Sequence, residues 1–152
     1  FSKFQYIFTP LPNLQMISTT RLGLGRGRMP IHERFFGGGS NSFRGVLFDE
    51  LGPTDPDSGR PVGGKALLLF NFDFTFPILS SIENLRGSVF FDHGNVFDKR
   101  RQVSWSGFQN ALGFGLRYRT PLGPIRMELG WNLDPEQSDK NPLLFITIGN
   151  VF

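Results

Sequence analysis

The feature that most constrains the fold of this chain is a strict alternation of apolar and polar residues between positions 65 and 76. Successive side chains of a β-strand point to opposite faces, so every second residue lies on the same face. One face of this run has four phenylalanines, Phe70, Phe72, Phe74 and Phe76. The other face has Lys65, Asn71, Asp73 and Thr75. Such a strand either covers the core of a soluble sandwich or faces lipid from a barrel with a polar lumen.

The same alternation recurs along the chain, and no helical period competes with it. Further strands are predicted at residues 2–9, 14–24, 84–97, 111–119, 125–131 and about 143–152. This gives about seven strands of roughly ten residues, the length needed to cross a bilayer at a tilt. The connections alternate between short and long, as in outer-membrane barrels. We therefore predict an all-β fold, an antiparallel transmembrane β-barrel segment, with the soluble sandwich as the alternative.

Composition agrees with this prediction and argues against other classes. No segment approaches about 18 consecutive apolar residues, which excludes a transmembrane helix. The mean hydropathy of -0.16 is low, as expected when apolar residues occupy every second position. A net charge of +3, without a basic run interleaved with aromatic residues, gives no support to a nucleic-acid partner. The absence of cysteine fits both a reducing compartment and an outer membrane.

The alternation stops between residues 25 and 64, and a loop of this length is normally functional or disordered. Three glycines at Gly37, Gly38 and Gly39 permit positive φ, so the loop can fold back tightly. It can then deliver the guanidinium of Arg44, followed by Gly45, into the interior. Two carboxylates, Asp73 and Asp92, lie on the polar faces of neighbouring predicted strands. Because buried charges need partners, we predict that these acids clamp Arg44.

The remaining candidate motifs do not point to an enzyme. The three glycines lack the following Lys-Ser/Thr pair and the helix that a phosphate-binding loop requires. The two histidines, His32 and His93, are far apart and lack metal-ligand spacing. The side chains of Asp92 and His93 point to opposite faces of one strand, so they do not form a hydrolase pair. We therefore expect no catalytic residue, no metal and no cofactor.

Four motifs and the terminal residue together resemble a known family. They are Glu33 to Gly45, Gly63 to Leu68, Phe90 to Phe97, Tyr118 to Arg126, and Phe152. In this order and at these spacings they are similar to the carboxyl-terminal barrel of the BamA-type surface-antigen family, and the similarity covers almost the whole chain. One residue departs from the family pattern, since Val46 stands where an aromatic usually follows Arg-Gly.

The resemblance implies a specific architecture. That family has a sixteen-stranded barrel behind periplasmic domains and inserts other barrels into the outer membrane without ATP. Residues 1–152 are then one partial outer-membrane barrel domain with the last seven strands, since seven strands alone do not close. The loop at about 25–64 corresponds to an extracellular loop that folds into the lumen. The implied location is the outer membrane of a Gram-negative type of cell.

The resemblance also implies sites and partners. The clamp consists of Arg44, Gly45, Asp73 and Asp92, and the carboxyl-terminal recognition strand contains Ile146, Ile148 and Phe152. The partners are the lipid bilayer, unfolded outer-membrane protein clients and accessory assembly lipoproteins. A two-partner-type secretion pore of the same superfamily is the alternative function. The Arg-Gly loop disfavours an ordinary porin.

Overall fold

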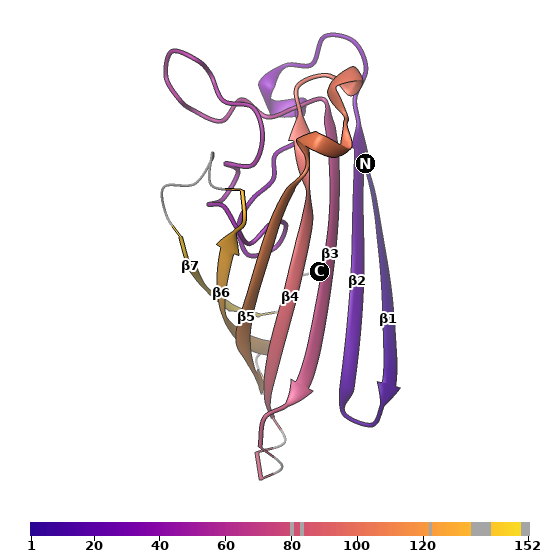
Figure 1. The fold of residues 1–152 in the computed structure, drawn as a ribbon, viewed down its shortest axis with the longest axis vertical. Coiled ribbons are helices and arrows are strands. Elements are labelled where there is room, and N and C mark those ends of the chain that lie inside the picture. The colour runs from indigo at the N-terminus through magenta and orange to yellow at the C-terminus, as the bar shows by residue number, and fades with distance from the viewer. Residues whose placement is uncertain (80, 83, 122, 135–140, 150–152) are drawn as a thin grey trace.

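The computed structural model describes residues 1–152 except 80, 83, 122, 135–140 and 150–152. The described residues form seven strands in one antiparallel sheet, in which every strand pairs with its neighbours in sequence (Figure 1). The strands are β1 (Ser2–Leu11), β2 (Leu14–Leu24), β3 (Ala66–Pro77), β4 (Leu85–Phe97), β5 (Gln109–Thr120), β6 (Gly123–Asn132) and β7 (Leu143–Ile148). Three single turns of 3-10 helix are η1 (Ile31–Glu33), η2 (Arg100–Gln102) and η3 (Trp105–Gly107). In the described part of the chain, no helix has the length and apolar character needed to cross a membrane.

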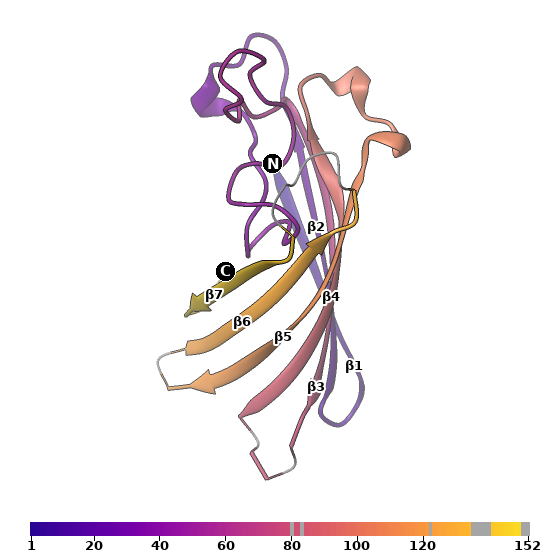
Figure 2. The ribbon, with the colours of Figure 1, turned by 60° about the vertical axis from the view of Figure 1, so that its left-hand side comes forward.

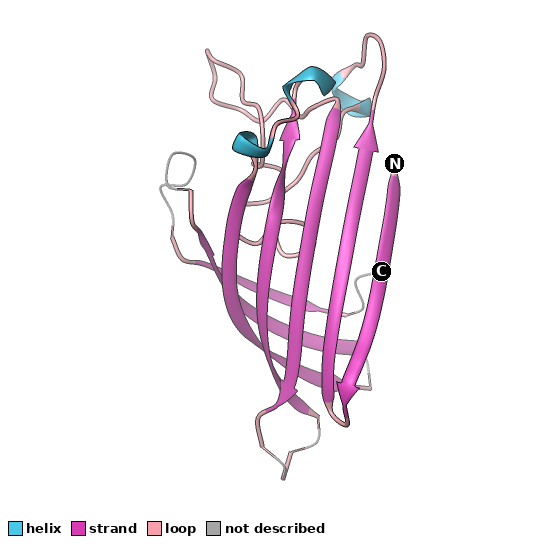
Figure 3. Ribbon diagram, turned by 45° about the vertical axis from the view of Figure 1, so that its right-hand side comes forward, coloured by secondary structure: helices cyan, strands magenta, loops and turns pink. Residues whose placement is uncertain are grey.

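The sheet is open and curved, which is the shape of a piece of barrel wall (Figure 2). The helical turns and long connections gather at one end of the strands (Figure 3). The described parts of the short connections lie at the other end. The all-β antiparallel prediction is therefore confirmed. The last strand differs, because β7 ends at Ile148 and Phe152 lies outside the described residues.

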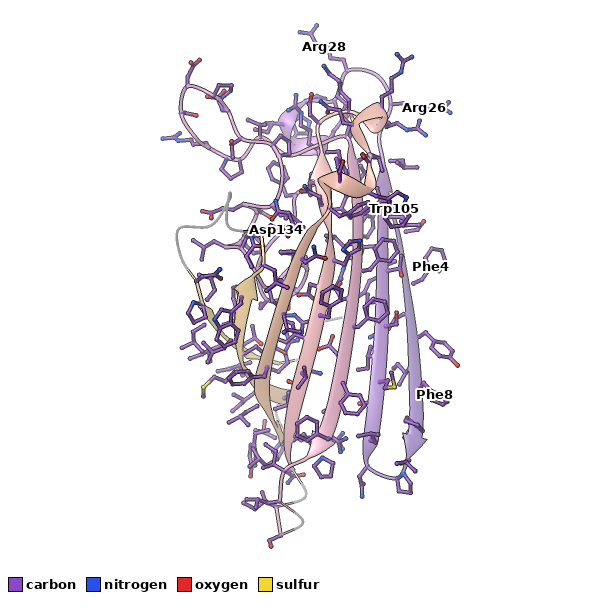
Figure 4. All side chains as sticks on the ribbon, viewed as in Figure 1. Phe4, Phe8, Arg26, Arg28, Trp105 and Asp134 are labelled. Carbon is purple, nitrogen blue, oxygen red and sulfur yellow. The ribbon has the colours of Figure 1, made fainter. Side chains whose placement is uncertain are left out.

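Exposure alternates along the strands as the sequence pattern predicts. On β3 the outward Phe72 and Phe74 are 49% and 37% exposed, whereas Asn71 and Thr75, which flank this pair in sequence, are buried. On the edge strand β1, Phe4 and Phe8 project away from the sheet (Figure 4). One face is therefore an apolar surface, and the other is a polar surface covered in part by the loop.

The core lies between the inward face of the sheet and the long loop of residues 25–65. It consists of loop residues Phe43, Val46 and Leu51 together with Leu67, Leu69, Val96 and Ala111 of the strands. Figure 2 shows the loop on the concave side of the sheet. The inward face of β3, which was predicted to be polar, carries the apolar side chains of Leu67 and Leu69. These two residues are covered by the loop rather than by water. Val46, the departure from the family pattern, is buried in this cluster.

Candidate functional site

A tight turn within the long loop presents residues 43–45 to the barrel wall. Gly38 and Gly39 have φ values of 114° and 84°, a region that favours glycine. The Ser42 hydroxyl closes the turn, since it accepts from the Gly38 N–H and donates to the Gly38 carbonyl, both at 2.7 Å. The Gly39 N–H donates to the Val46 carbonyl at 3.0 Å. The backbone is therefore folded back on itself before the chain reaches Arg44.

Gly37 differs in backbone conformation from the two glycines that follow it. Positive φ is found at Gly38 and Gly39 but not at Gly37. The Gly37 carbonyl instead accepts a bond from the Leu51 N–H at 2.9 Å. A Cβ added at Gly37 would lie 3.2 Å from side-chain atoms of Leu51 and Val96. A small residue is needed there because the loop packs closely against β4.

Arg44 lies against Asp92 of β4, which accepts three hydrogen bonds from it. The Arg44 backbone N–H and Nε–H both donate to Asp92 Oδ2 at 2.9 Å, and Nη2 donates to Oδ1 at 2.7 Å. One carboxylate thereby fixes both the backbone and the side chain of Arg44. This geometry is the bidentate fork that guanidinium and carboxylate groups form.

Two further acids and one aromatic ring complete the surroundings of the guanidinium. Asp73 of β3 accepts from Nη1 at 2.8 Å and from Nη2 at 3.3 Å, and Glu128 of β6 accepts from Nη1 at 3.4 Å. Arg44 Cζ lies 3.7 Å from the centroid of the Phe90 ring, in cation-π geometry. From here on, the clamp means the charged residues of the predicted clamp, Arg44, Asp73 and Asp92, together with Glu128.

The clamp is almost fully buried, so its charges depend on one another. Arg44 is 4% exposed and Asp92 is fully buried. Burial alone would lower the pKa of Arg44, but the charges of Asp92 and Asp73 and their hydrogen bonds outweigh it and raise the pKa well above its usual value. Arg44 is therefore permanently charged. Arg117 of β5 shares two of its acids, donating to Asp73 and, at 2.9 Å, to Glu128.

The structure thus brings Arg44, Asp73 and Asp92 together, and adds residues that were not predicted. Glu128 and Arg117 lie on the polar faces of β6 and β5, so face periodicity was the signal that could have included them. Asn71 was predicted to face the lumen but was not predicted to belong to the site. In the structure its side-chain amide donates to Asp92 Oδ1 at 2.8 Å and to the Ser42 carbonyl. Nothing in the sequence marks Phe90 as the aromatic partner, except its position two residues before Asp92.

Glycines on the loop and the wall make this close approach possible. A Cβ added at Gly45 would lie 2.7 Å from the Ala111 Cβ, and one at Gly130 of β6 would lie 1.9 Å from the Arg44 carbonyl oxygen. A Cβ at Gly113 of β5 would lie 2.2 Å from the Phe90 ring. The loop backbone and the ring beneath Arg44 occupy space that side chains would otherwise fill.

The other predicted residues lie elsewhere. Ile146 and Ile148 are 61% and 75% exposed on β7 and do not contribute to the clamp. His93 stacks on Phe108 with 4.8 Å between ring centroids, whereas His32 lies in η1. Across the described residues, no group of three or more acidic, histidine or cysteine side chains could hold a metal ion.

Comparison with known proteins agrees with this open wall and its clamped loop. The Omp85 superfamily domain matches residues 2–152, so the chain belongs to the Omp85 superfamily. Within it, the chain is a BamA-type carboxyl-terminal barrel segment of the outer membrane. This assignment decides in favour of the barrel over the soluble sandwich.

Individual relatives agree with this assignment. The chain is 31% identical over 137 residues, 87% of its length, to outer membrane protein assembly factor BamA of Nitratidesulfovibrio vulgaris. It is 28% identical, over 86% of its length, to the BamA of Neisseria meningitidis. It is also 28% identical, over 78% of its length, to a SAM50-like protein of Schizosaccharomyces pombe. The chain spans only 17%, 20% and 26% of these three proteins, respectively.

Proposed function

We propose that this chain forms part of the barrel core of an insertase that assembles other β-barrels into the outer membrane. Two of the relatives named above are outer membrane protein assembly factors, and each aligns over more than four fifths of this chain. This favours assembly over the two-partner-type secretion pore. The proposed partners are unfolded barrel clients, accessory assembly lipoproteins and the surrounding lipid.

The clamp is the functional centre of this proposal, and the observation that carries it is the buried contact of Arg44 with three strands. Asp73, Asp92 and Glu128 belong to β3, β4 and β6, so one loop residue is bonded across the inward face of the wall. The clamp would hold the loop inside the lumen and fix the shape of the wall. We propose no covalent step and no catalytic residue, because positioning is all that these groups supply.

The test is a client-insertion assay with the full-length parent protein in liposomes. The rate at which an unfolded client becomes protease-resistant is measured for wild type, Arg44→Ala and Arg44→Lys. We expect about tenfold slower insertion for Arg44→Ala. Arg44→Lys should recover only part of the rate, since an ammonium group does not reproduce the planar fork.

Arg86→Ala is the matched control. Within the described residues, the Arg86 side chain donates to the backbone carbonyls of Asn13 and Thr75, and neither of these residues belongs to the clamp. It should insert clients at the wild-type rate. A folded Arg44→Ala protein that inserts clients as fast as wild type would show that the clamp is not the functional centre. Export of a soluble polypeptide by a wild-type protein that inserts no clients would favour the secretion pore.

A further inference from the structure

The clamp borders a cavity of about 210 Å³ on the inward face of the sheet, and basic residues beyond the clamp also line this cavity. The cavity is lined by five basic side chains, Lys3, Arg21, Arg44, Arg117 and Arg126. Among the described residues, the lining contains one carboxylate, Asp73. These residues come from β1, β2, β3, β5, β6 and the loop, so the cavity spans the described part of the lumen wall.

Two of these arginines, Arg21 and Arg126, form no salt bridge within the described part of the chain, although they lie close enough to the acids of the clamp to interact with them electrostatically. Arg21 donates to the side-chain oxygen of Asn71 and, at 2.6 Å, to the Asn41 carbonyl. Arg126 donates to the Thr147 hydroxyl and to Asn41 Oδ1, both at 3.0 Å. Both guanidiniums therefore bind one loop residue through neutral oxygens. Each uses two of its five N–H groups in these bonds, which leaves donors for a ligand.

The charges of the cavity and the clamp do not balance. Asp73, Asp92 and Glu128 form salt bridges with Arg44 and Arg117. Among the described residues, the five basic side chains of the cavity and these three acids leave a surplus of two positive charges. Arg21 and Arg126 both bond to Asn41, and like charges brought this close together repel each other unless an anion compensates them.

The chemistry of the donors selects among anions. A carboxylate would neutralise one of the two charges, whereas a phosphate monoester carries about −1.5 to −2 at neutral pH. Planar guanidinium groups match phosphate oxygens in bidentate geometry, and the ammonium group of Lys3 adds a point charge. We propose that this cavity binds a phosphate group, free or at the head of an anionic lipid, between Arg21 and Arg126 and beside Asn41.

The experiment uses the full-length parent protein folded in detergent at constant pH and ionic strength. Inorganic phosphate replaces chloride, and binding is followed by the ³¹P NMR linewidth. Wild type should show saturable broadening, and the Arg21→Gln/Arg126→Gln double variant should bind at least tenfold more weakly. Glutamine keeps a donor for Asn41 but removes the charge. Arg86→Gln, outside the cavity, should bind as wild type does.

Three outcomes would overturn the proposal. They are no saturable binding to wild type, equal binding to wild type and the double variant, and equal loss in Arg86→Gln. If the double variant does not fold, Lys3→Gln on the exposed strand β1 replaces it and should weaken phosphate binding about threefold. Unchanged binding to a folded Lys3→Gln protein would then count against the site.

The source of the phosphate is distinguished by a second probe. Short-chain phosphatidic acid, below its micelle-forming concentration, is compared with inorganic phosphate. Binding of the lipid at least tenfold more tightly assigns the site to a lipid headgroup. Equal affinity assigns it to free phosphate. The readout is phosphate binding, so failure of this proposal leaves the insertion assay unaffected.

Discussion

Two segments of the long loop, residues 37–51 and residues 53–61, are both rich in turn-forming residues, glycine in the first and proline in the second, but lie in very different environments. Residues 37–51 lie against the wall, where Phe43, Val46 and Leu51 are at most 3% exposed. Residues 53–61 form a separate turn held by its own contacts, with Asp55 Oδ1 accepting from the N–H groups of Asp57 and Ser58. The difference shows that turn-forming residues allow a loop to fold back. The position of the loop against the wall is then determined by its apolar side chains and by a charged residue that has partners on the wall.

The largest expected effect comes from removing the charge of the inserted segment, residues 37–51. Arg44→Ala leaves the buried carboxylate of Asp92 without its cation, whereas Glu128 keeps its ion pair with Arg117, and the change costs about 4 kcal/mol in the free energy of loop insertion. Hydrogen exchange of residues 37–51 in the full-length parent protein measures this cost. The exchange of residues 53–61 should not change. Equal protection of residues 37–51 in wild type and Arg44→Ala would remove the distinction between the two segments.

The apolar contacts of the inserted segment give the next effect. Leu51→Ala opens a cavity in the cluster beneath the loop and should destabilise insertion by about 3 kcal/mol. The matched control is Phe48→Ala, because Phe48 is three residues away and 74% exposed. It should change the same exchange rates by less than about 0.5 kcal/mol. Similar effects of the two substitutions would mean that burial does not hold the loop.

The turn at Ser42 is expected to contribute less. Ser42→Ala removes the hydroxyl that bonds to both the N–H and the carbonyl of Gly38, at a cost of about 1 kcal/mol. Ser40→Ala is the control, since the Ser40 hydroxyl makes one long contact of 3.4 Å with Asn41. Protease sensitivity of the loop should rise in the first variant only. A matching rise in the second would assign the effect to general loosening of the turn.

The smallest effect is a pH dependence confined to the segment of residues 53–61. Hydrogen bonds from the Ser58 backbone and hydroxyl lower the pKa of Asp55. The carboxylate therefore stabilises its turn above the unfolded pKa of about 3.9, and this contribution is lost as the pH falls through the lower folded value. Proteolysis at residues 53–61 by an acid-active protease should increase below about pH 4 in wild type. In Asp55→Ala, proteolysis at residues 53–61 should be high at every pH. If the proteolysis of the wild type does not depend on pH, the Asp55 carboxylate does not stabilise this turn.

The strands and their faces could be predicted from the sequence because alternation is a local property. Phe72 and Asn71 are neighbours whose opposite environments follow from the period of the strand. The pairing of Arg44 with Asp73 and Asp92 was predicted from the polar faces of two strands together with the family resemblance, since nothing local links residue 44 to residue 92.

The remaining contacts depend on where the loop lies, which the sequence does not encode locally. Leu67 and Leu69 occupy the polar face of β3 because the loop covers them. Glu128 reaches Arg44 only because the sheet curves and carries β6 toward the loop. Gly37 was assigned a backbone role, whereas its role is steric and depends on Leu51 and Val96 of the folded structure.

The partners of Arg44 also set an order of folding. Each strand pairs with its neighbour in sequence, so the wall can form by successive hairpins of low contact order. Arg44 is 48 residues from Asp92 and 84 residues from Glu128, so its bonds close much longer segments of chain. They can be completed only after β6 has joined β5. We therefore expect insertion of the loop to be completed late in folding, so that protease resistance of residues 37–51 reports when this part of the wall has formed.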